Sequence, residues 1–556
     1  MRLTATAAFA LSMLFASPAV AADYWVEAGK NGNGSKSSPF GSVQKALEQV
    51  SAGDTVHVRA GTYSEQLTTE SAGTKGDPIR ITGEGKVRIE APDRVLDVRH
   101  PHHVFESIHF DANFASSDGV RVKDAGDGTI FRNVEVSRAG KDCIDLRSPE
   151  GVRIERSLIH DCLRWENGRE DAHGIVAGAV RDLVIRNTEV HTFSGDAFQV
   201  DPDRQKPGWT DVRIIGCKFW LEPLPKKKQG FPAGKSPGEN AIDTKTMETV
   251  SNRAELHVED TVAYGYRNGF ISNQAAFNIK ESVEATFDGV TVYDSEIAFR
   301  LRGAVGSHPK GSVTHIYNAV LYDLDKAIRF EDGIQEPIEV YNATFGRGID
   351  RNFQGAAVPE PEDQWLDIRN LLVLGDSIPS QASGSGNAKA SDGGFRDVMN
   401  GDYRLAGKPA FVDQGEMLSA VTTDRRGASR PKGAGWDPGA YEHGAAPADA
   451  GGEDDAGPAG DAGAGLDASA SHDVSPGDDI GGAISDISTG SDASGRDAAA
   501  SDDGKSGGSE GCGCSGAGGR GAPGSGLLLL LLLAGTILAR RAGATEPKRS
   551  GATASK

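Results

Sequence analysis

A four-residue pattern that recurs along the chain constrains the fold more than any other feature of the sequence. A small residue is followed by an apolar, a variable and a second apolar residue, as in Gly119-Val120-Arg121-Val122. Further copies begin at Cys143, His173, Ala197, Ala241, Gly269, Ala298 and Ala327. Because side chains alternate between the two faces of a β-strand, the pattern predicts short strands with an inward apolar stack and one outward column. That column consists of Arg121, Asp145, Ile175, Gln199, Asp243, Ile271, Arg300 and Arg329.

A second pattern gives the length of the repeat. It runs apolar, any, Asn or a similar residue, any, any, apolar, as in Phe131-Arg132-Asn133-Val134-Glu135-Val136. Successive copies mostly lie 23 to 31 residues apart, with one step of 44 residues between Gly216 and Asp260. Repeats of this length with short β segments are typical of a β-solenoid. Leucine-rich repeats have a similar length, but their Leu-x-Leu core is missing from this sequence.

We therefore predict an all-β protein, a right-handed parallel β-helix over residues 23–442. The handedness follows from the general preference of parallel crossovers and from the family resemblance given below. Ser42 is placed to cap a short helix that carries Val43, Ala46 and Leu47. Such a helix covers the first coil, whose strand edges are otherwise unpaired.

The two ends of the chain have compositions of their own. Residues 1–22 have the features of a secretory signal peptide: Arg2, an apolar run through Phe15, and a small-residue site at Ala19-Val20-Ala21. Residues 443–511 are predicted to be a disordered linker, since residues 445–511 hold 15 acidic residues against two basic ones and no aromatic residue. This stretch accounts for most of the net charge of −20, so that charge says nothing about partners of the folded part.

Residues 512–541 combine Cys512 and Cys514, a glycine-rich run, the apolar stretch from Leu527 to Ala539 and Arg540-Arg541. This arrangement resembles the myxobacterial-type C-terminal sorting tail, which implies anchoring at the outer membrane or cell surface, with residues 542–556 as a basic cytoplasmic tail. An ordinary C-terminal membrane anchor is the alternative. We expect a secreted, surface-anchored monomer that binds no nucleic acid. The segment Asp437-Pro438-Gly439-Ala440-Tyr441-Glu442 resembles an ending found in secreted bacterial β-helix proteins.

Three cysteines lie in the predicted β-helix, namely Cys143, Cys162 and Cys217. The odd number argues against a full disulfide framework. Cys143 occupies a small-residue position, which favours a buried thiol. A bridge between Cys143 and Cys162 is the alternative in an oxidising compartment.

The outward face of the predicted strands carries most of the candidate functional residues. Stacked coils repeat about every 4.8 Å, so a row of side chains on this face suits an extended polymer. Central carboxylates flanked by arginines indicate an anionic glycan. The candidate substrate-binding residues are Arg121, Asp145, Arg147, Gln199, Lys227, Asn273 and Arg302. Lys227 belongs to an insertion at residues 221–238 that could cover an acidic substrate.

This face is similar to that of the pectate-lyase-type β-helix lyases, including family 9 polysaccharide lyases. The resemblance covers roughly residues 23–331 and implies β-elimination, in which Asp-bound Ca²⁺ neutralises the uronate and a lysine acts as base. It implies Asp196, Asp201 and Asp243 as calcium ligands and Lys245 as the base. His173 and Arg300 complete the candidate catalytic residues.

Hydrolysis by two carboxyl groups is an alternative activity. Asp118, Asp142 and His173 stand in segments similar to the Asn-Thr-Asp, Asp-Asp-Cys and Gly-His-Gly motifs of polygalacturonases, the family 28 glycoside hydrolases. Lys141 replaces one of the expected aspartates. A glycan-binding or adhesive surface protein without catalysis is the third possibility, because the fold does not determine the function.

Several of these residues also have structural interpretations. Asp118, Asp142, Asp196, Asn240 and Asn268 precede the small-residue position, where side chains can form capping ladders at solenoid corners. Asp243 and Lys245 can form a surface ion pair, and Lys226-Lys227-Lys228 can be a solvated loop. At residues 172–177 the frame is ambiguous, because a slip of one residue exchanges the two faces.

Overall fold

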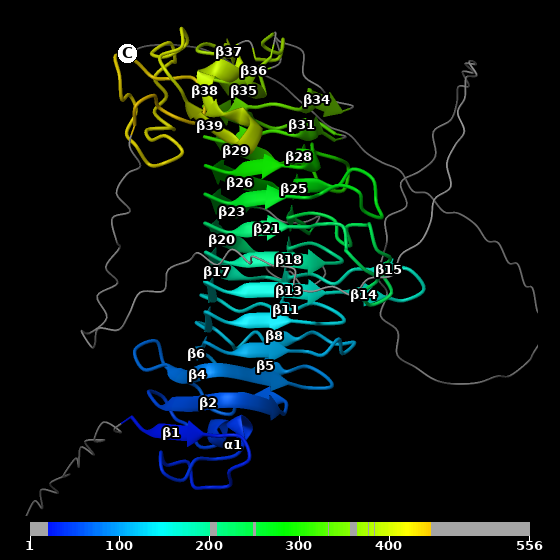
Figure 1. The fold of residues 1–556 in the computed structure, drawn as a ribbon, viewed down its shortest axis with the longest axis vertical. Helices are drawn as coiled ribbons and strands as arrows, with labels where there is room; N and C mark the ends of the chain where they lie inside the picture. The colour runs from blue at the N-terminus through cyan, green and yellow to red at the C-terminus, as the bar shows by residue number, and fades with distance from the viewer. Residues whose placement is uncertain are drawn as a thin grey trace, which may run out of the picture. The chain divides into compact units, whose positions relative to one another are not determined.

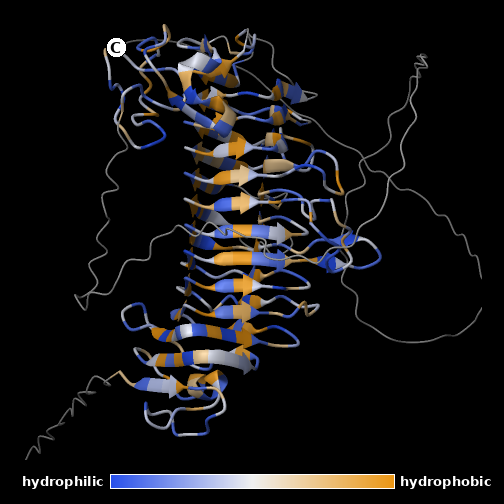
Figure 2. Cartoon of the chain, in the orientation of Figure 1, coloured by the Kyte–Doolittle hydropathy of each residue, from blue (hydrophilic) through white to orange (hydrophobic). Residues whose placement is uncertain are grey.

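The structure is a computed structural model, and it describes residues 21–200, 208–247, 252–331, 333–355, 364–375, 377–382 and 384–445. Nearly every strand in it belongs to a parallel β-helix, so the predicted fold class is confirmed. Apart from the first and the last coils, each coil contributes one strand to each of three parallel stacks, and the strands of a stack follow one another up the molecule in Figure 1. Inward side chains are apolar, and Figure 2 shows the strands as alternating apolar and polar bands.

Stack 1 and stack 2 belong to one 24-stranded sheet. Stack 1 contains β1 (Asp23–Val26), β2 (Thr55–Ser64), β4 (Ile79–Glu90), β6 (His103–Glu106), β9 (Ile130–Arg132), β12 (Arg153–Glu155), β17 (Arg181–Arg186), β20 (Thr210–Ile215), β23 (Ala254–Glu259), β26 (Val283–Asp288), β29 (Val313–Tyr317), β32 (Ile338–Tyr341) and β35 (Leu366–Arg369). Stack 2 begins with the ends of β2 and β4 and continues through β7 (His109–Asp111), β10 (Glu135–Ser137), β13 (Leu158–Cys162), β18 (Glu189–Phe193), β21 (Lys218–Trp220), β24 (Val262–Tyr264), β27 (Thr291–Tyr293), β30 (Val320–Leu321), β33 (Thr344–Phe345), β36 (Leu372–Leu374) and β37 (Ala388–Ala390).

Stack 3 is a separate 11-stranded sheet, and it carries the first sequence pattern. Its strands are β3 (Leu67–Thr68), β5 (Leu96–Val98), β8 (Val120–Val122), β11 (Ile144–Leu146), β16 (Ile175–Ala177), β19 (Phe198–Val200), β22 (Ile242–Asp243), β25 (Ala275–Ile279), β28 (Ser295–Leu301), β31 (Leu324–Phe330) and β34 (Ile349–Gly355).

The second sequence pattern marks the bend between stack 1 and stack 2. The third residue of every copy has a positive φ, from Ser107 at 57° and Asn133 at 52° to Asn370 at 54°. Asparagine, aspartate and glycine are the residues that adopt this left-handed conformation most readily, which explains why they recur there. The bend therefore fixes the repeat that the sequence displays.

Segments outside the three stacks pack against both ends of the described coils. The helix α1 (Val43–Leu47) buries Val43, Ala46 and Leu47, and the Ser42 hydroxyl accepts a hydrogen bond from the backbone N–H of Lys45, as predicted. At the other end, residues 391–445 contain two 3₁₀ turns, Asp392–Gly394 and Val398–Asn400, and the hairpin of β38 (Phe395–Asp397) and β39 (Asp402–Leu405). No helix in the described part of the chain is long and apolar enough to cross a membrane.

Two parts of the predicted outward column are wrong. Ile175 points inward and Val176 takes the outward position, because the frame at residues 172–177 slips by one residue. Ile271 lies in a loop, and Asn278 on β25 occupies that position instead. A four-residue pattern is short enough to arise by chance in a loop, and only the strand pairing separates the true copy from the false one.

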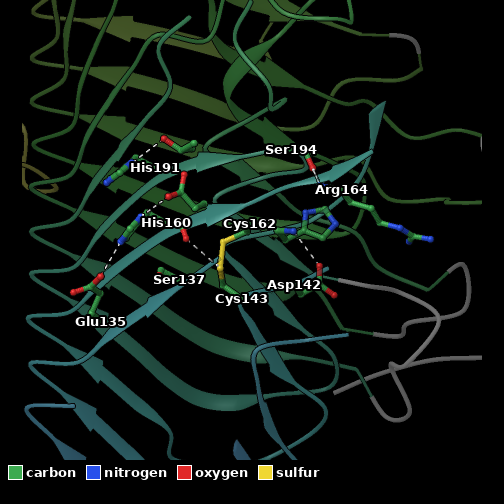
Figure 3. Close-up of a disulfide and its surroundings, with 12 residues drawn as sticks. Glu135, Ser137, Asp142, Cys143, His160, Cys162, Arg164, His191 and Ser194 are labelled. Atoms are coloured by element: carbon green, nitrogen blue, oxygen red, sulfur yellow. Dashed lines mark hydrogen bonds and ion pairs between the residues drawn. A yellow bond between two sulfur atoms is a disulfide. The ribbon is translucent and has the colours of Figure 1, made fainter. Parts of the chain in front are cut away.

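Cys143 and Cys162 form a disulfide, with Cα atoms 5.5 Å apart and a sequence separation of 19. The bridge links the start of β11 in stack 3 to the end of β13 in stack 2, and Figure 3 shows it inside the coil. Cys217 is buried and unpaired, and burial raises the pKa of its thiol to about 12.

Removing this disulfide should destabilise the protein. A Cys143→Ser/Cys162→Ser variant should lose about 3 kcal/mol of unfolding free energy, because a loop of this length is no longer closed in the unfolded chain. Urea unfolding of the two proteins with and without a thiol reductant measures the change. The reductant should lower the midpoint of the natural protein and leave that of the variant where it is. An equal response of both would show that the bridge does not stabilise the coil.

Candidate functional site

The outward positions of stack 3 form a continuous column that crosses the coils in register. It consists of Asp97, Arg121, Asp145, Val176, Gln199, Asp243, Asn278, Arg300, Arg329 and Gln354. The expectation that Asp145, Gln199 and Asp243 share one face is confirmed by this pairing. All three are nevertheless buried, because longer side chains beside them cover the middle of the face.

A second column, two residues further along each strand, is predominantly cationic. Its members in the described coils are Arg99, Lys123, Arg147, Gly178, Lys245, Lys280, Arg302 and Glu331. Several of these cations pair with carboxylates of the first column: Arg147 lies 3.0 Å from Asp145, and Lys123 lies 3.6 Å from Asp97. The carboxylates hold the cations in positions that remain partly exposed to solvent, so the edge of the face presents positive charge at most of the described coils, with breaks at Gly178 and Glu331.

Asp243 is the junction of this arrangement in the central coils. Its Oδ2 lies 3.1 Å from the Lys280 ammonium and 3.6 Å from that of Lys245, and its Oδ1 accepts a 2.9 Å hydrogen bond from Asn278. The Lys245 side chain is 30 % exposed while Asp243 is buried. Lys245 therefore reaches solvent from a position that a buried carboxylate fixes.

A ladder of polar side chains runs along the other edge of stack 3. The backbone N–H of His173 donates to Asp142 (3.0 Å), that of Asp196 to His173 Nδ1 (2.8 Å), that of Asn240 to Asp196 (3.0 Å), and that of Ala275 to Asn240 (3.2 Å). His173 thus stands in the aspartate column and not in the small-residue column. Asn268 is not a rung, because Ala275 takes that place. These contacts cap backbone groups at the corner, as the structural interpretation predicted.

The three residues singled out by the polygalacturonase motifs occupy successive rungs of this ladder. Burial opposes ionisation of Asp118, but Lys141 at 3.1 Å and Arg121 outweigh it and lower its pKa to about 2. Burial raises the pKa of Asp142, and the negative charge of Asp118 adds to this effect. Asp118 and Asp142 thus differ in the direction of their pKa shifts.

Three loops stand beside the central coils and share a small apolar cluster. The hairpin of β14 (Arg164–Trp165) and β15 (Arg169–Glu170) projects from the coils in Figure 1. Trp165 packs edge-on against Phe231 of the 221–238 insertion and against Phe270, which is 37 % exposed. Gly230, at φ 91°, lies so close to Trp165 that an added Cβ would come within 2.5 Å of the ring. The hairpin, the 221–238 insertion and the loop of Phe270 therefore pack against one another through Trp165.

The lysine run of the insertion is only partly accounted for by these contacts. Lys228 forms an ion pair with Asp161 at the end of β13, whereas Lys226 and Lys227 are exposed. The role of Lys227 in binding a substrate stays a prediction.

Glu239 is a candidate residue that the sequence analysis did not assign. It forms an ion pair with Arg169 of the β14–β15 hairpin, so it connects this hairpin with the end of the 221–238 insertion. Burial raises the pKa of Glu239 to about 8, and Asp196 adds to the shift while Arg169 opposes it. The pKa of Asp196 is also raised, by burial first and by Asp243 second. Glu239 directly precedes Asn240 of the ladder, but nothing in the local sequence indicates that Arg169, 70 positions away, meets it.

The arginines predicted at the later coils converge on one carboxylate. Arg300 and Arg329 lie 2.6 Å and 2.8 Å from Glu331, and Arg329 also donates to the side chain of Asn273. Arg302 occupies the neighbouring position in the cationic column. Arg300 and Arg302 therefore lie about two coils from Lys245, and Asn273 is linked to this group through Arg329. Their assigned roles stay predictions.

Two of the predicted calcium ligands, Asp196 and Asp243, are engaged by other side chains on both of their oxygens. Asp196 accepts hydrogen bonds from Asn240 (2.7 Å) and Gln199 (2.7 Å), one on each oxygen, and both oxygens of Asp243 are also engaged. Among the residues that the structure describes, no group of three or more His, Cys, Asp or Glu side chains is arranged to hold a metal ion. Asp201 lies outside the described residues. The described contacts do not favour a calcium site, and the calcium assignment stays a prediction.

Comparisons with known proteins match the start of the chain and its fold. Residues 27–79 match the model of a family described as a protein of unknown function (DUF1565). The uncharacterized protein YwoF of Bacillus subtilis (strain 168) is 32 % identical over 81 residues, which are 13 % of this chain and 17 % of that protein. The match thus spans less than a fifth of that relative.

The chain is also similar to solved structures of lyases. Pectate lyase Pel9A has a TM-score of 0.43 and 16 % identity, over 76 % of this chain and 96 % of that one. A rhamnogalacturonan lyase has a TM-score of 0.46 and 14 % identity, over 68 % and 91 %. An alginate lyase from Paenibacillus sp. str. FPU-7 has a TM-score of 0.38 and 19 % identity, over 51 % and 91 %.

Proposed function

We propose that this chain is a carbohydrate-active protein that binds an acidic, uronate-containing polysaccharide along stack 3 and cleaves it by β-elimination. The observation that carries the proposal is the cationic column. Arg99, Lys123 and Arg147 stand at one position of three successive strands. Lys245, Lys280 and Arg302 stand at the same position of three further successive strands, and Gly178 lies between the two groups. A polymer with a carboxylate on each sugar meets such a row with charge-assisted hydrogen bonds at several coils.

Lys245 is the base in this proposal. In β-elimination the base removes the proton from the carbon next to the uronate carboxylate, and the electron pair forms a double bond as the glycosidic C–O bond breaks. The leaving oxygen takes up a proton. A cation beside the substrate carboxylate favours the carbanionic transition state, and Lys280 stands next to Lys245 on Asp243. The proposal requires Lys245 to be unprotonated when it acts.

Hydrolysis is a second candidate, and Glu239 favours it. A general acid must hold its proton near neutral pH, and the raised pKa of Glu239, about 8, meets that requirement. Asp196, Glu239 and Asp243 lie close enough to influence one another's charge. In a hydrolase one of the two aspartates would be the second carboxyl group.

One assay separates these activities. The purified full-length protein is incubated with pectate, alginate or chondroitin sulfate, in buffer with Ca²⁺ or with a chelator. Elimination gives an unsaturated product with new ultraviolet absorbance, which we expect. New reducing ends without that absorbance would support hydrolysis, and retention of the polymer without either product would support a non-catalytic binder. Loss of activity in the presence of chelator would support a role for Ca²⁺ in the reaction. Full activity with chelator would remove Ca²⁺ from the proposal.

We also propose that the protein is secreted and anchored at the cell surface. The signal peptide and the sorting tail lie almost wholly outside the described residues, so this rests on their sequences. The Cys143–Cys162 disulfide supports it, because such bonds persist mainly in oxidising compartments. Protease added to intact cells should remove the protein from their surface, and full protection in unlysed cells would contradict the proposal.

A further inference from the structure

A second surface of the coils, away from stack 3, is hollowed into a groove. Two cavities of about 630 Å³ and 440 Å³ lie along the bend between stack 1 and stack 2, and both are lined by Asn133 and Glu135. Together they extend from Thr62 on β2 to Glu189 on β18. They share Asn133 and Glu135 as lining residues, so they lie next to each other along the bend, and we call the two together the groove.

The groove has a regular lining that follows the repeat. Its stack 2 wall is an outward column that includes His109, Glu135, Leu158 and Glu189 in register. Its floor includes the bend residues Ser107, Asn133 and Asn187, each with a positive φ. From β2 to β18 the groove crosses five coil-to-coil steps, or roughly 24 Å at the usual strand spacing. An extended polymer can therefore lie in it with one similar set of contacts per coil.

Most of the charges in this groove are already paired within the protein. The Glu135 carboxylate lies 3.1 Å from His160 and 3.2 Å from His109. Glu189 accepts a 2.5 Å hydrogen bond from the Trp220 ring N–H and lies 3.3 Å from Lys218. Arg88 lies 2.7 Å from Asp111. The walls thus offer carboxylates, amides and hydroxyls as hydrogen-bonding groups with little uncompensated charge.

This lining differs in kind from the cationic column of stack 3. The remaining cations of the groove, Lys86 and Arg156, are exposed and stand several coils apart, so they do not form a row. A polymer with a carboxylate on every sugar would therefore find no cation at most of these coils. Figure 3 shows Glu135 and His160 on one side of the Cys143–Cys162 bridge and Asp142 on the other. The two surfaces belong to the same coils but face different ways.

We propose that this groove binds an extended neutral polysaccharide. Carboxylates, amides and hydroxyls recognise sugar hydroxyls by hydrogen bonding, and the coil spacing is close to the length of one pyranose ring in an extended chain. Binding here needs neither cleavage nor the stack 3 face. The groove would hold the protein on a neutral matrix while stack 3 remains free for an acidic polymer.

Affinity electrophoresis of the full-length protein tests the proposal. The gels contain hydroxyethylcellulose, laminarin, galactomannan, dextran or pectate as probes. We expect retardation by at least one neutral polymer, and this retardation should persist as NaCl is raised from about 0.05 to about 0.5 M, because screening acts on charges only. No retardation by any neutral polymer would overturn the proposal, as would retardation by pectate alone.

A substitution in the groove locates the binding. Leu158 is half-buried between Glu135 and Glu189, so Leu158→Arg fills the groove with a side chain that both carboxylates can hold. It should raise the dissociation constant at least about tenfold. Thr286→Arg, on the outward side of β26 in stack 1 and outside the two cavities, is the matched control and should bind as the natural protein does.

Two further measurements keep the test decisive. Thermal melts of both variants show whether they are folded. Glu189→Gln keeps the shape of the groove and should also weaken binding, so it serves as the test variant if Leu158→Arg does not fold. Unchanged binding by every folded groove variant would overturn the proposal. Elimination of pectate by Leu158→Arg should match the natural protein, so failure of the groove and failure of the proposed lyase activity are distinguishable.

Discussion

Replacing Lys245 by alanine should lower the rate of uronate elimination about 10²- to 10⁴-fold, the usual contribution of a positioned general base. Its ammonium lies 3.6 Å from Asp243 and reaches solvent at the edge of stack 3, where it can meet a polymer on the cationic column. The loss should fall mainly on kcat, because neighbouring coils still bind the substrate. The increase of ultraviolet absorbance with pectate or alginate measures the rate.

Lys280 provides the matched control for this experiment. It contacts the same Asp243 oxygen at 3.1 Å from the next coil, so Lys280→Ala removes an equal charge from the same place. If Lys245 is the base and Lys280 binds substrate, Lys280→Ala should raise KM and leave most of kcat. Equal losses of kcat in both variants would contradict the role of Lys245 as the base and would make it one substrate-binding cation among several. Full activity of Lys245→Ala would remove the assignment.

The coil architecture could be predicted from the sequence because both of its periodic features have local causes. Inward positions of a buried parallel strand must be apolar, and the bend between stack 1 and stack 2 needs a left-handed residue in every coil. These two requirements give the patterns around Arg121 and Asn133. The register of stack 3 then follows, which is why Asp145, Gln199 and Asp243 share a column as expected.

The contacts between loops could not be predicted in the same way. Arg169 and Glu239 come from an irregular hairpin and an insertion, and no period relates their positions. The Cys143–Cys162 bridge was only one of two alternatives, because a cysteine at a small-residue position satisfies the core with or without a partner. The false copy at Ile271 shows the converse limit, since a loop can carry the pattern without joining the sheet.

Replacing Arg430 by alanine should cost about 3 to 5 kcal/mol of unfolding free energy, the usual cost of breaking a buried ion pair from one side. The side chains of Arg430 and Glu442 are fully buried and lie 2.8 Å apart. Arg430 also donates to the Asn318 side chain at 2.9 Å, which ties residues 418–445 to the bend next to β29. Without Arg430, the Glu442 carboxylate is left without its cation in a site that already raises its pKa by burial.

Denaturant unfolding and amide exchange of residues 418–445 measure this loss and its location. Arg430→Met with Glu442→Gln is the matched control, because it removes both charges, keeps most of the volume and leaves an oxygen that can accept from the backbone, so it should cost clearly less than Arg430→Ala alone. Glu442 also accepts hydrogen bonds from the backbone N–H groups of Lys432 (2.9 Å) and Asp437 (3.0 Å), so Glu442→Ala should loosen the same segment. An Arg430→Ala change below about 1 kcal/mol would mean that the apolar contacts of Leu418, Val421 and Trp436 hold the segment by themselves. The segment from Asp437 to Glu442 would then contribute little to the stability of the last coils.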